Sequence, residues 1–112
     1  MIVGRTFYFD ASHHLTDYEG ACERVHGHTY RLEIQVEDEV GECDMVLDFG
    51  DLKNTVKRKV LSKLDHCDLN EIMENPTAEN IVEWIWGRLE GGLNIYSVKL
   101  WEGEGKWALK TK

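Results

Sequence analysis

Three histidines stand at positions from which two strands could deliver them to one metal ion. On a β-strand, residues i and i+2 project from the same face, about 6–7 Å apart, so His26 and His28 can converge on one ion. His13 ends an earlier alternating segment, and pairing with the segment that starts at His26 would bring the two ends together. The same alternation turns His14 the other way, toward solvent. Three neutral histidines leave a fourth position open, as catalytic zinc sites do.

Further side chains could move protons beside such a centre. Cys22 lies four residues before His26. It is a partly buried small residue, a fourth metal ligand that closes the site, or a thiol whose pKa a metal and a histidine would lower. Asp65 and His66 are adjacent just past a predicted helix. There a carboxylate can hold an imidazole as a base, or the histidine can simply favour the helix C-terminus. Glu102, at the end of an apolar segment, is by itself an ordinary acid of a turn.

Hydrophobic periodicity predicts the elements that must position these residues. A period of two predicts strands over 2–13, 26–40, 95–101 and 106–110. A period of three to four predicts helices over 49–64 and from 78 to the glycines at 91–92, with Asp48 and Thr77 as N-caps. The order ββααββ favours an α+β fold, a four-stranded antiparallel sheet with two helices on one face. So small a sheet leaves exposed edges, which favours association between subunits.

Composition limits the class of protein further. The 112 residues suffice for one domain, taken as 1–112. The net charge of −8 disfavours nucleic-acid binding, and the one basic cluster, KNTVKRK, fits a single helix face. Without a long apolar run or an N-terminal leader pattern, we expect a cytoplasmic protein that does not cross a membrane. The odd count of three cysteines argues against a disulfide framework, and we expect Cys43 and Cys67 to be buried.

Six short blocks together carry a family resemblance. FDASHHL, CERVHGH, LDFGDL, LDHCDLN, NPTAEN and the late strand that ends in Glu102 resemble the 6-pyruvoyl-tetrahydropterin synthase family, in family order and over nearly the whole chain. The branch that makes 6-carboxy-tetrahydropterin for queuosine and archaeosine is the most similar. The resemblance implies the tunnelling fold (T-fold), in which trimers close a barrel of strands and two trimers stack into a homohexamer with active sites between subunits.

The resemblance also implies roles for individual residues. It implies a Zn²⁺ ion on His13, His26 and His28. It implies a proton-transfer set of Cys22, Asp65 and His66. In this set the thiol and the acid–base pair come from different subunits. Glu102 would anchor the pterin substrate by accepting hydrogen bonds from its ring nitrogens, and Thr77 would join it in substrate binding.

The implied reaction converts 7,8-dihydroneopterin triphosphate to 6-carboxy-5,6,7,8-tetrahydropterin, with loss of triphosphate and acetaldehyde. Cys22 satisfies the C-x-x-x-H-G-H pattern of that branch, although Trp101 and Glu102 stand where Lys-Glu-Thr is common in it. Glu23 satisfies the E-x-x-H-G-H pattern of relatives that cleave dihydroneopterin to 6-hydroxymethyl-dihydropterin, in which it would be the acid or base. Formation of 6-pyruvoyl-tetrahydropterin and a non-catalytic structural zinc module are the remaining alternatives.

Overall fold

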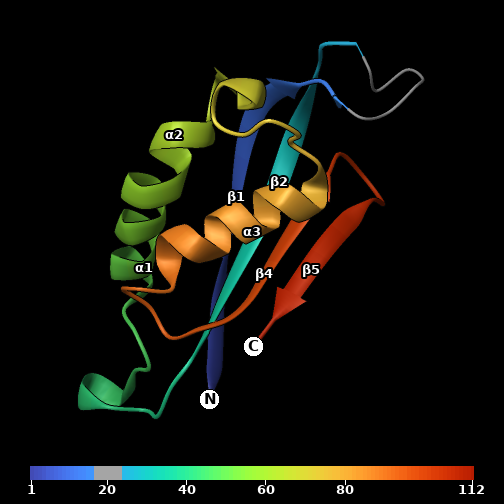
Figure 1. Ribbon diagram of the computed structural model, residues 1–112. Helices are drawn as coiled ribbons and strands as arrows, with labels where there is room; N and C mark the ends of the chain where they lie inside the picture. Colours follow the sequence, from blue (N-terminus) through green and yellow to red (C-terminus); the bar gives the residue numbers. More distant parts are fainter. Residues whose placement is uncertain (17–23) are drawn as a thin grey trace.

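The computed structural model describes residues 1–16 and 24–112, so Cys22 and Glu23 lie outside the described residues. The four main strands occupy the predicted regions and are β1 (Ile2–His13), β2 (His26–Glu37), β4 (Ile95–Glu102) and β5 (Trp107–Thr111). Figure 1 shows these strands as one sheet with the helices packed against one of its faces. The predicted α+β class is therefore confirmed.

The sheet has one more strand than the sequence predicts. Its order over the described residues is β3-β1-β2-β4-β5. The added strand, β3 (Cys67–Asp68), runs parallel to β1 and pairs with it at Ala11 and Ser12. The prediction of four strands, all antiparallel, is therefore wrong, because a strand of two residues shows no periodicity that could reveal it.

Each predicted helix begins at its predicted cap. The first helical run consists of α1 (Phe49–Val56), a π-helical turn η3 (Lys57–Leu61) and α2 (Ser62–Leu64). Asp48 caps α1 by accepting from the backbone N–H groups of Gly50 at 2.6 Å and Asp51 at 3.3 Å. The Thr77 hydroxyl accepts from Asn80 N–H at 3.1 Å and caps α3 (Ala78–Leu89). Such caps satisfy N–H groups that the helix itself leaves unpaired. Two short 3-10 turns are η2 (Glu42–Asp44) and η4 (Leu69–Glu71).

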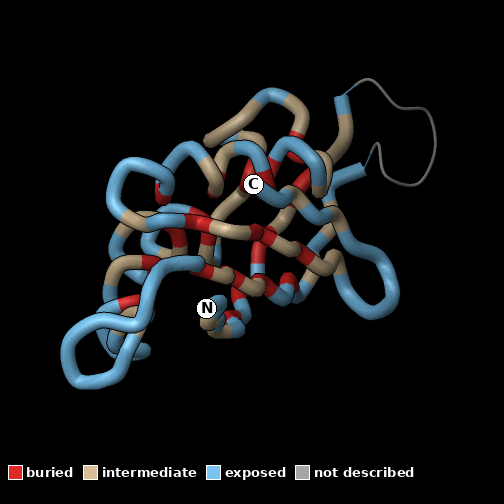
Figure 2. The backbone as a smooth tube through the Cα atoms, turned by 90° about the horizontal axis from the view of Figure 1, so that it is seen from below, coloured by how far each residue is buried: buried red, intermediate tan, exposed pale blue. Residues whose placement is uncertain are grey.

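The core lies between the sheet and the helices (Figure 2). Alternate residues of β1 are buried, and this buried row ends at His13, which is 1% exposed. In β2 the row begins near His28 and continues through Tyr30, Leu32 and Ile34, which are fully buried. The histidines therefore occupy the end of the same sheet face that builds the hydrophobic core.

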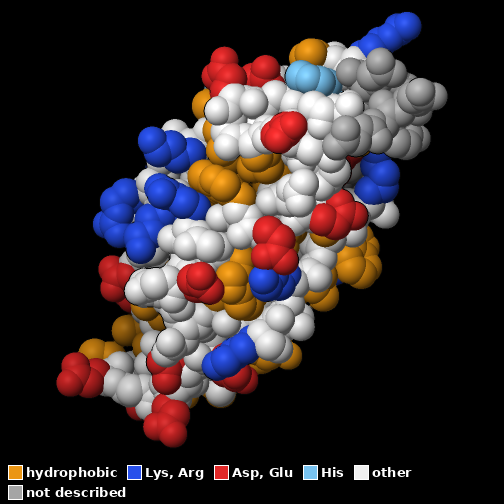
Figure 3. All heavy atoms as spheres, in the orientation of Figure 1, with side chains coloured by type: hydrophobic (Ala, Val, Ile, Leu, Met, Phe, Trp, Pro, Cys, Tyr) orange, Lys and Arg blue, Asp and Glu red, His pale blue; other side chains and the backbone are white. Residues whose placement is uncertain are grey.

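The outer surface agrees with most of the sequence expectations. Lys and Arg side chains gather over α1 and α2 (Figure 3), where KNTVKRK forms a solvated helix face. None of the described helices is both long and apolar enough to span a bilayer. The expectation for Cys43 is wrong. It is exposed in η2 with a φ of 57°, in the left-handed region, whereas Cys67 is half-buried.

Candidate metal centre

Pairing of β1 with β2 brings the three predicted histidines together. In the antiparallel register His13 lies opposite His26, and His28 follows on the same face opposite Ala11. Directly opposite residues share a sheet face, so the rings converge, with centroids 4.6–5.0 Å apart. The Nε2 atoms of His13 and His26 are 3.0 Å apart. Tetrahedral zinc with bonds of about 2.0–2.1 Å needs ligand nitrogens about 3.3 Å apart, so the cluster is close to the spacing that zinc requires.

Backbone carbonyls determine which nitrogen of each ring is free. His13 Nδ1 lies 2.8 Å from Pro76 O, and His26 Nδ1 lies 2.6 Å from Arg24 O. A carbonyl oxygen only accepts, so each Nδ1 carries the hydrogen, and in a neutral imidazole Nε2 then keeps a lone pair. Metal-binding histidines are oriented in the same way. When both rings are neutral, the two Nε2 lone pairs face each other at 3.0 Å and repel, and a metal ion bound by both nitrogens would remove this repulsion.

His28 supplies the third nitrogen and an independent indication of a missing partner. Its Nε2 is buried and has no hydrogen-bond partner among the described residues. Glu102 Oε1 lies 3.2 Å away, a distance typical of an ion pair but without hydrogen-bond geometry. Burial lowers the pKa of His28, while Glu102 opposes this, so burial favours the neutral form that binds metal. A buried polar atom without a partner costs about 1–3 kcal/mol, and a bound metal would supply the partner.

Glu102 is held at the mouth of this cluster by the end of β4. It pairs in register with Tyr30 of β2, and its side chain is only 18% exposed. The chain then turns through Gly103 and Gly105, whose φ values of 68° and 77° lie in the left-handed region that glycine tolerates best. The carboxylate and the three histidines place their ligand atoms within 4.8 Å of one another. Glu102 is therefore not the solvated turn acid that its sequence position alone suggests.

A cavity of about 250 Å³ opens beside the carboxylate. Its lining comes from α3, the end of β4 and the following turn, and includes Thr77, Ala78, Glu79, Glu102 and Lys106. The volume lies just below the range of about 300–1,000 Å³ of drug-sized ligand pockets, which suits a small ring system. The predicted pair Thr77 and Glu102 therefore shares one cavity, with the Thr77 hydroxyl also engaged as the α3 cap.

Asp65 and His66 form the predicted carboxylate–imidazole pair directly after α2. His66 Nδ1 lies 2.9 Å from Asp65 Oδ1. Asp10 of β1 holds both residues through its backbone, since its N–H donates to Asp65 Oδ1 at 3.0 Å and its carbonyl accepts from His66 N–H at 2.7 Å. His66 has a φ of 58°, and its side chain is 78% exposed. The imidazole edge that does not bind Asp65 is thus available to another molecule.

The Asp65–His66 pair and the histidine cluster belong to opposite faces of the sheet. Asp10 is three residues before His13, so strand alternation points the two side chains to different sides. A cavity of about 540 Å³ beside the pair is lined by the outward residues Asp10, Ser12 and Thr29, together with His66 and Cys67, and His28 also borders it. Among the described residues, the structure therefore does not bring the pair and the three histidines into one cluster.

His14 differs from its prediction as a solvent-facing residue. It is half-buried, and its backbone N–H donates to the Asn70 side-chain oxygen at 2.9 Å. Asp10 contacts the predicted site residues Asp65 and His66, and Asn70 contacts His14, the neighbour of His13. The sequence analysis predicted a role for neither Asp10 nor Asn70. The signal available for Asn70 was its place in LDHCDLN, whereas Asp10 acts on Asp65 and His66 through backbone atoms and leaves no signal in residue type.

The fold and the cluster define an α+β protein with a candidate metal centre at one end of its sheet. The family model described as 6-pyruvoyl tetrahydropterin synthase matches residues 2–111, and the chain belongs to this family. The solved structure of Caenorhabditis elegans 6-pyruvoyl tetrahydropterin synthase is similar, with a TM-score of 0.90 and 25% sequence identity. The match covers 100% of this chain and 95% of that chain.

Two curated relatives carry different activity names. A 6-carboxy-5,6,7,8-tetrahydropterin synthase of Synechocystis sp. is 37% identical over 110 residues, which cover 90% of this chain and 85% of that protein. A dihydroneopterin monophosphate aldolase of Pyrococcus furiosus is 44% identical over 99 residues, which cover 85% of this chain and 83% of that protein. Similarity therefore identifies the family, and both activities are represented among its similar members.

Proposed function

We propose that this chain is a zinc-dependent enzyme that converts 7,8-dihydroneopterin triphosphate to 6-carboxy-5,6,7,8-tetrahydropterin, releasing triphosphate and acetaldehyde. The observation that carries the proposal is the convergence of His13, His26 and His28 beside the cavity that Glu102 borders. Nε2 keeps a lone pair in His13 and His26, and Nε2 of His28 has no hydrogen-bond partner among the described residues. The name of the Synechocystis relative supports the choice of reaction.

The residues of the chain divide the work between binding and proton transfer. Zinc held by the three histidines would polarise the oxygens of the substrate side chain and so acidify the neighbouring C–H bond. Glu102 accepts hydrogen bonds from the pterin ring N–H groups and orients the ring in the cavity. Asp65 holds His66 Nδ1, which leaves Nε2 to receive and return a proton. Cys22, as a thiolate, moves the second proton.

The separation of the Asp65–His66 pair from the three histidines supports a site that is shared between subunits. We propose a homohexamer, a dimer of trimers, in which the Asp65–His66 pair of one subunit faces the histidines of another. The open edge of β5, and the short β3 that covers only part of β1, leave strand edges to join. Mixing inactive His28→Ala and His66→Ala proteins should then restore activity, because about a quarter of randomly assembled sites combine two intact halves. Absence of recovery from mixed oligomers would refute shared sites.

The reaction is tested with zinc-loaded protein and two substrates. Dihydroneopterin triphosphate should yield triphosphate, acetaldehyde and the carboxylated pterin, whereas unphosphorylated dihydroneopterin should be left unchanged. If neither substrate turns over, the proposed activity is wrong. Detection of 6-pyruvoyl-tetrahydropterin as the product would instead identify a 6-pyruvoyl-tetrahydropterin synthase.

An aldolase is the second candidate, and two observations favour it. The Pyrococcus furiosus relative is named as one, and Glu23 satisfies the spacing expected of that group. Glycolaldehyde released from dihydroneopterin or its monophosphate would identify this activity. Cys22→Ala should abolish carboxytetrahydropterin formation but spare an aldolase, and Glu23→Gln should have the converse effect.

A further inference from the structure

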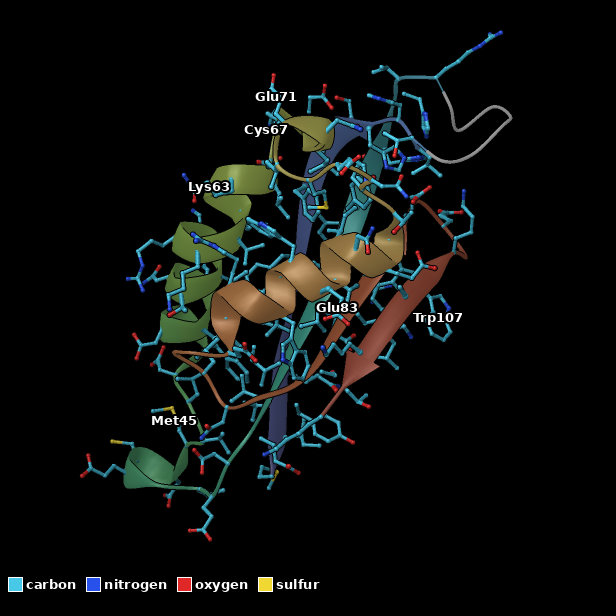
Figure 4. All side chains as sticks on the ribbon, in the orientation of Figure 1. Met45, Lys63, Cys67, Glu71, Glu83 and Trp107 are labelled. Atoms are coloured by element: carbon cyan, nitrogen blue, oxygen red, sulfur yellow. The ribbon has the colours of Figure 1, made fainter. Side chains whose placement is uncertain are left out.

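We infer that Asn70 is a positioning residue for the metal centre, because its side-chain amide fixes the backbone that directly follows His13. The inference rests on the proposed zinc site but not on any particular reaction. Asn70 lies in η4, between the Asp65–His66 pair and the Pro76 carbonyl that orients His13. Figure 4 labels Cys67 and Glu71, which place this segment beside the end of β1.

The Asn70 amide binds both polar groups of the His14 backbone. Its Oδ1 accepts from His14 N–H at 2.9 Å, and its Nδ2 donates to His14 O at 3.0 Å. Nδ2 also lies 3.4 Å from Glu74 O. His14 Nε2 lies 3.4 Å from Nδ2 as well. One N–H group thus faces Oδ1, and two carbonyl oxygens and an imidazole nitrogen lie around Nδ2, which determines the orientation of the amide because only one end of it can donate. A carboxylate cannot replace it, since its second oxygen would face the two carbonyls.

This arrangement extends the pairing between β1 and β3 with a side chain. The backbone ladder between them ends at the Ser12–Asp68 pair. Two residues further along each chain, the amide of Asn70 binds His14 as a strand peptide would. Asp68 keeps Asn70 in place, because its side chain accepts from Asn70 N–H at 3.1 Å. The segment that carries Asp65 and His66 is thereby tied to the strand that carries a metal ligand.

The path from Asn70 to the metal passes through one peptide plane. The His14 N–H belongs to the peptide bond that joins it to His13, so the amide restrains the ψ angle of His13 and the direction of its side chain. Through Glu74 O, Asn70 also holds the segment that leads to Pro76, whose carbonyl accepts from His13 Nδ1 at 2.8 Å. Loss of the Asn70 amide would therefore remove restraints on both the backbone of His13 and the carbonyl that binds its imidazole.

The test compares zinc affinity in Asn70→Ala and wild-type protein by competition with a chromophoric chelator, without substrate. Partners that orient metal ligands typically change metal affinity about 10- to 100-fold when they are lost, and we expect a loss in this range. Cobalt-loaded Asn70→Ala should also show an altered visible absorption spectrum, because that spectrum reports ligand geometry. Asn70→Asp should lose more affinity than Asn70→Ala.

Asn94→Asp is a matched control, because Asn94 donates to Asp38 at 2.7 Å in a hydrogen bond that involves none of the metal-site residues. It should lower the melting temperature and leave zinc affinity unchanged. If Asn70→Ala does not fold, Asn70→Ser retains one hydroxyl that can replace a single bond, and it should lose zinc affinity to a smaller extent. A folded Asn70 variant with wild-type zinc affinity and cobalt spectrum would overturn the inference. Failure of the wild-type protein to bind zinc would instead refute the zinc centre.

Discussion

Replacing Glu102 by glutamine separates two roles that its position allows. Its Oε1 lies 3.2 Å from His28 Nε2, close enough to join the histidines as a fourth ligand. Its side chain also borders the cavity that contains Thr77. A fourth ligand would close the site and favour a structural zinc module, whereas an anchor for the pterin leaves a coordination position for substrate.

The expected loss follows from hydrogen bonding. A carboxylate at this position can accept two ring N–H groups, whereas the glutamine amide keeps one acceptor and turns a donor toward the other N–H. One charge-assisted bond is lost, at about 1.5–3 kcal/mol, and a buried donor is left unpaired, at about 1–3 kcal/mol. The lower bounds sum to about 2.5 kcal/mol, so pterin affinity should fall at least about 60-fold. Zinc affinity should fall no more than about 100-fold, as for the loss of a group outside the coordination sphere.

Calorimetric titration with neopterin, which is oxidised and unreactive, measures the pterin affinity. Competition with a chelator measures the zinc affinity. Glu79→Gln is the matched control, since Glu79 lines the same cavity but is exposed in the first turn of α3. It should change neopterin affinity less than about threefold, because an exposed charge contributes little. Unchanged neopterin affinity in Glu102→Gln would refute the anchoring role. A zinc loss beyond about 1,000-fold, more than outer partners cause, would identify Glu102 as a ligand.

Two further predictions concern folding. Burial lowers the pKa of His28 below its ordinary 6.5, so the unfolded chain binds this proton first as the pH falls, and the metal-free protein should lose stability below about pH 6.5. Urea unfolding of wild-type and His28→Gln proteins at about pH 5.5 and 7.5 checks this, and an equal pH dependence in both would contradict it. Asp48→Ala removes the cap of α1 and should lower the free energy of unfolding by about 1 kcal/mol. Asp48→Asn, which can still accept, should lose less, and equal losses would exclude a capping effect.

Sequence alternation was enough to predict β1 and the approach of its histidine to β2. From Phe7 to His13 every second residue is buried, so both the strand and the face of its last residue could be predicted. Convergence with His26 and His28 then followed from antiparallel pairing. The π-helical turn at 57–61 could not be predicted, because Val56, Val60 and Leu64 keep a regular spacing of four through it.

Sequence patterns could not predict how the Asp65–His66 pair lies relative to the three histidines. The position of Asp65 and His66 depends on β3, which is too short for periodicity, and on backbone bonds to Asp10. His14 was misplaced for a related reason. Alternation predicts where a strand residue points but not which other segment packs over the end of the strand. Here Asn70, from a turn-rich segment, binds the backbone of His14.

The close approach of two imidazole nitrogens would make metal supply part of the folding equilibrium of the proposed zinc enzyme. With both rings neutral, the Nε2 lone pairs of His13 and His26 face each other at 3.0 Å, so a metal ion that binds only the folded state would hold the ends of β1 and β2 together. A free metal concentration a thousand times the dissociation constant stabilises the fold by about 4.1 kcal/mol. That is a large share of the about 5–15 kcal/mol that holds a typical domain together. The lifetime of this protein in a cell would then depend on the availability of zinc as well as on its packing.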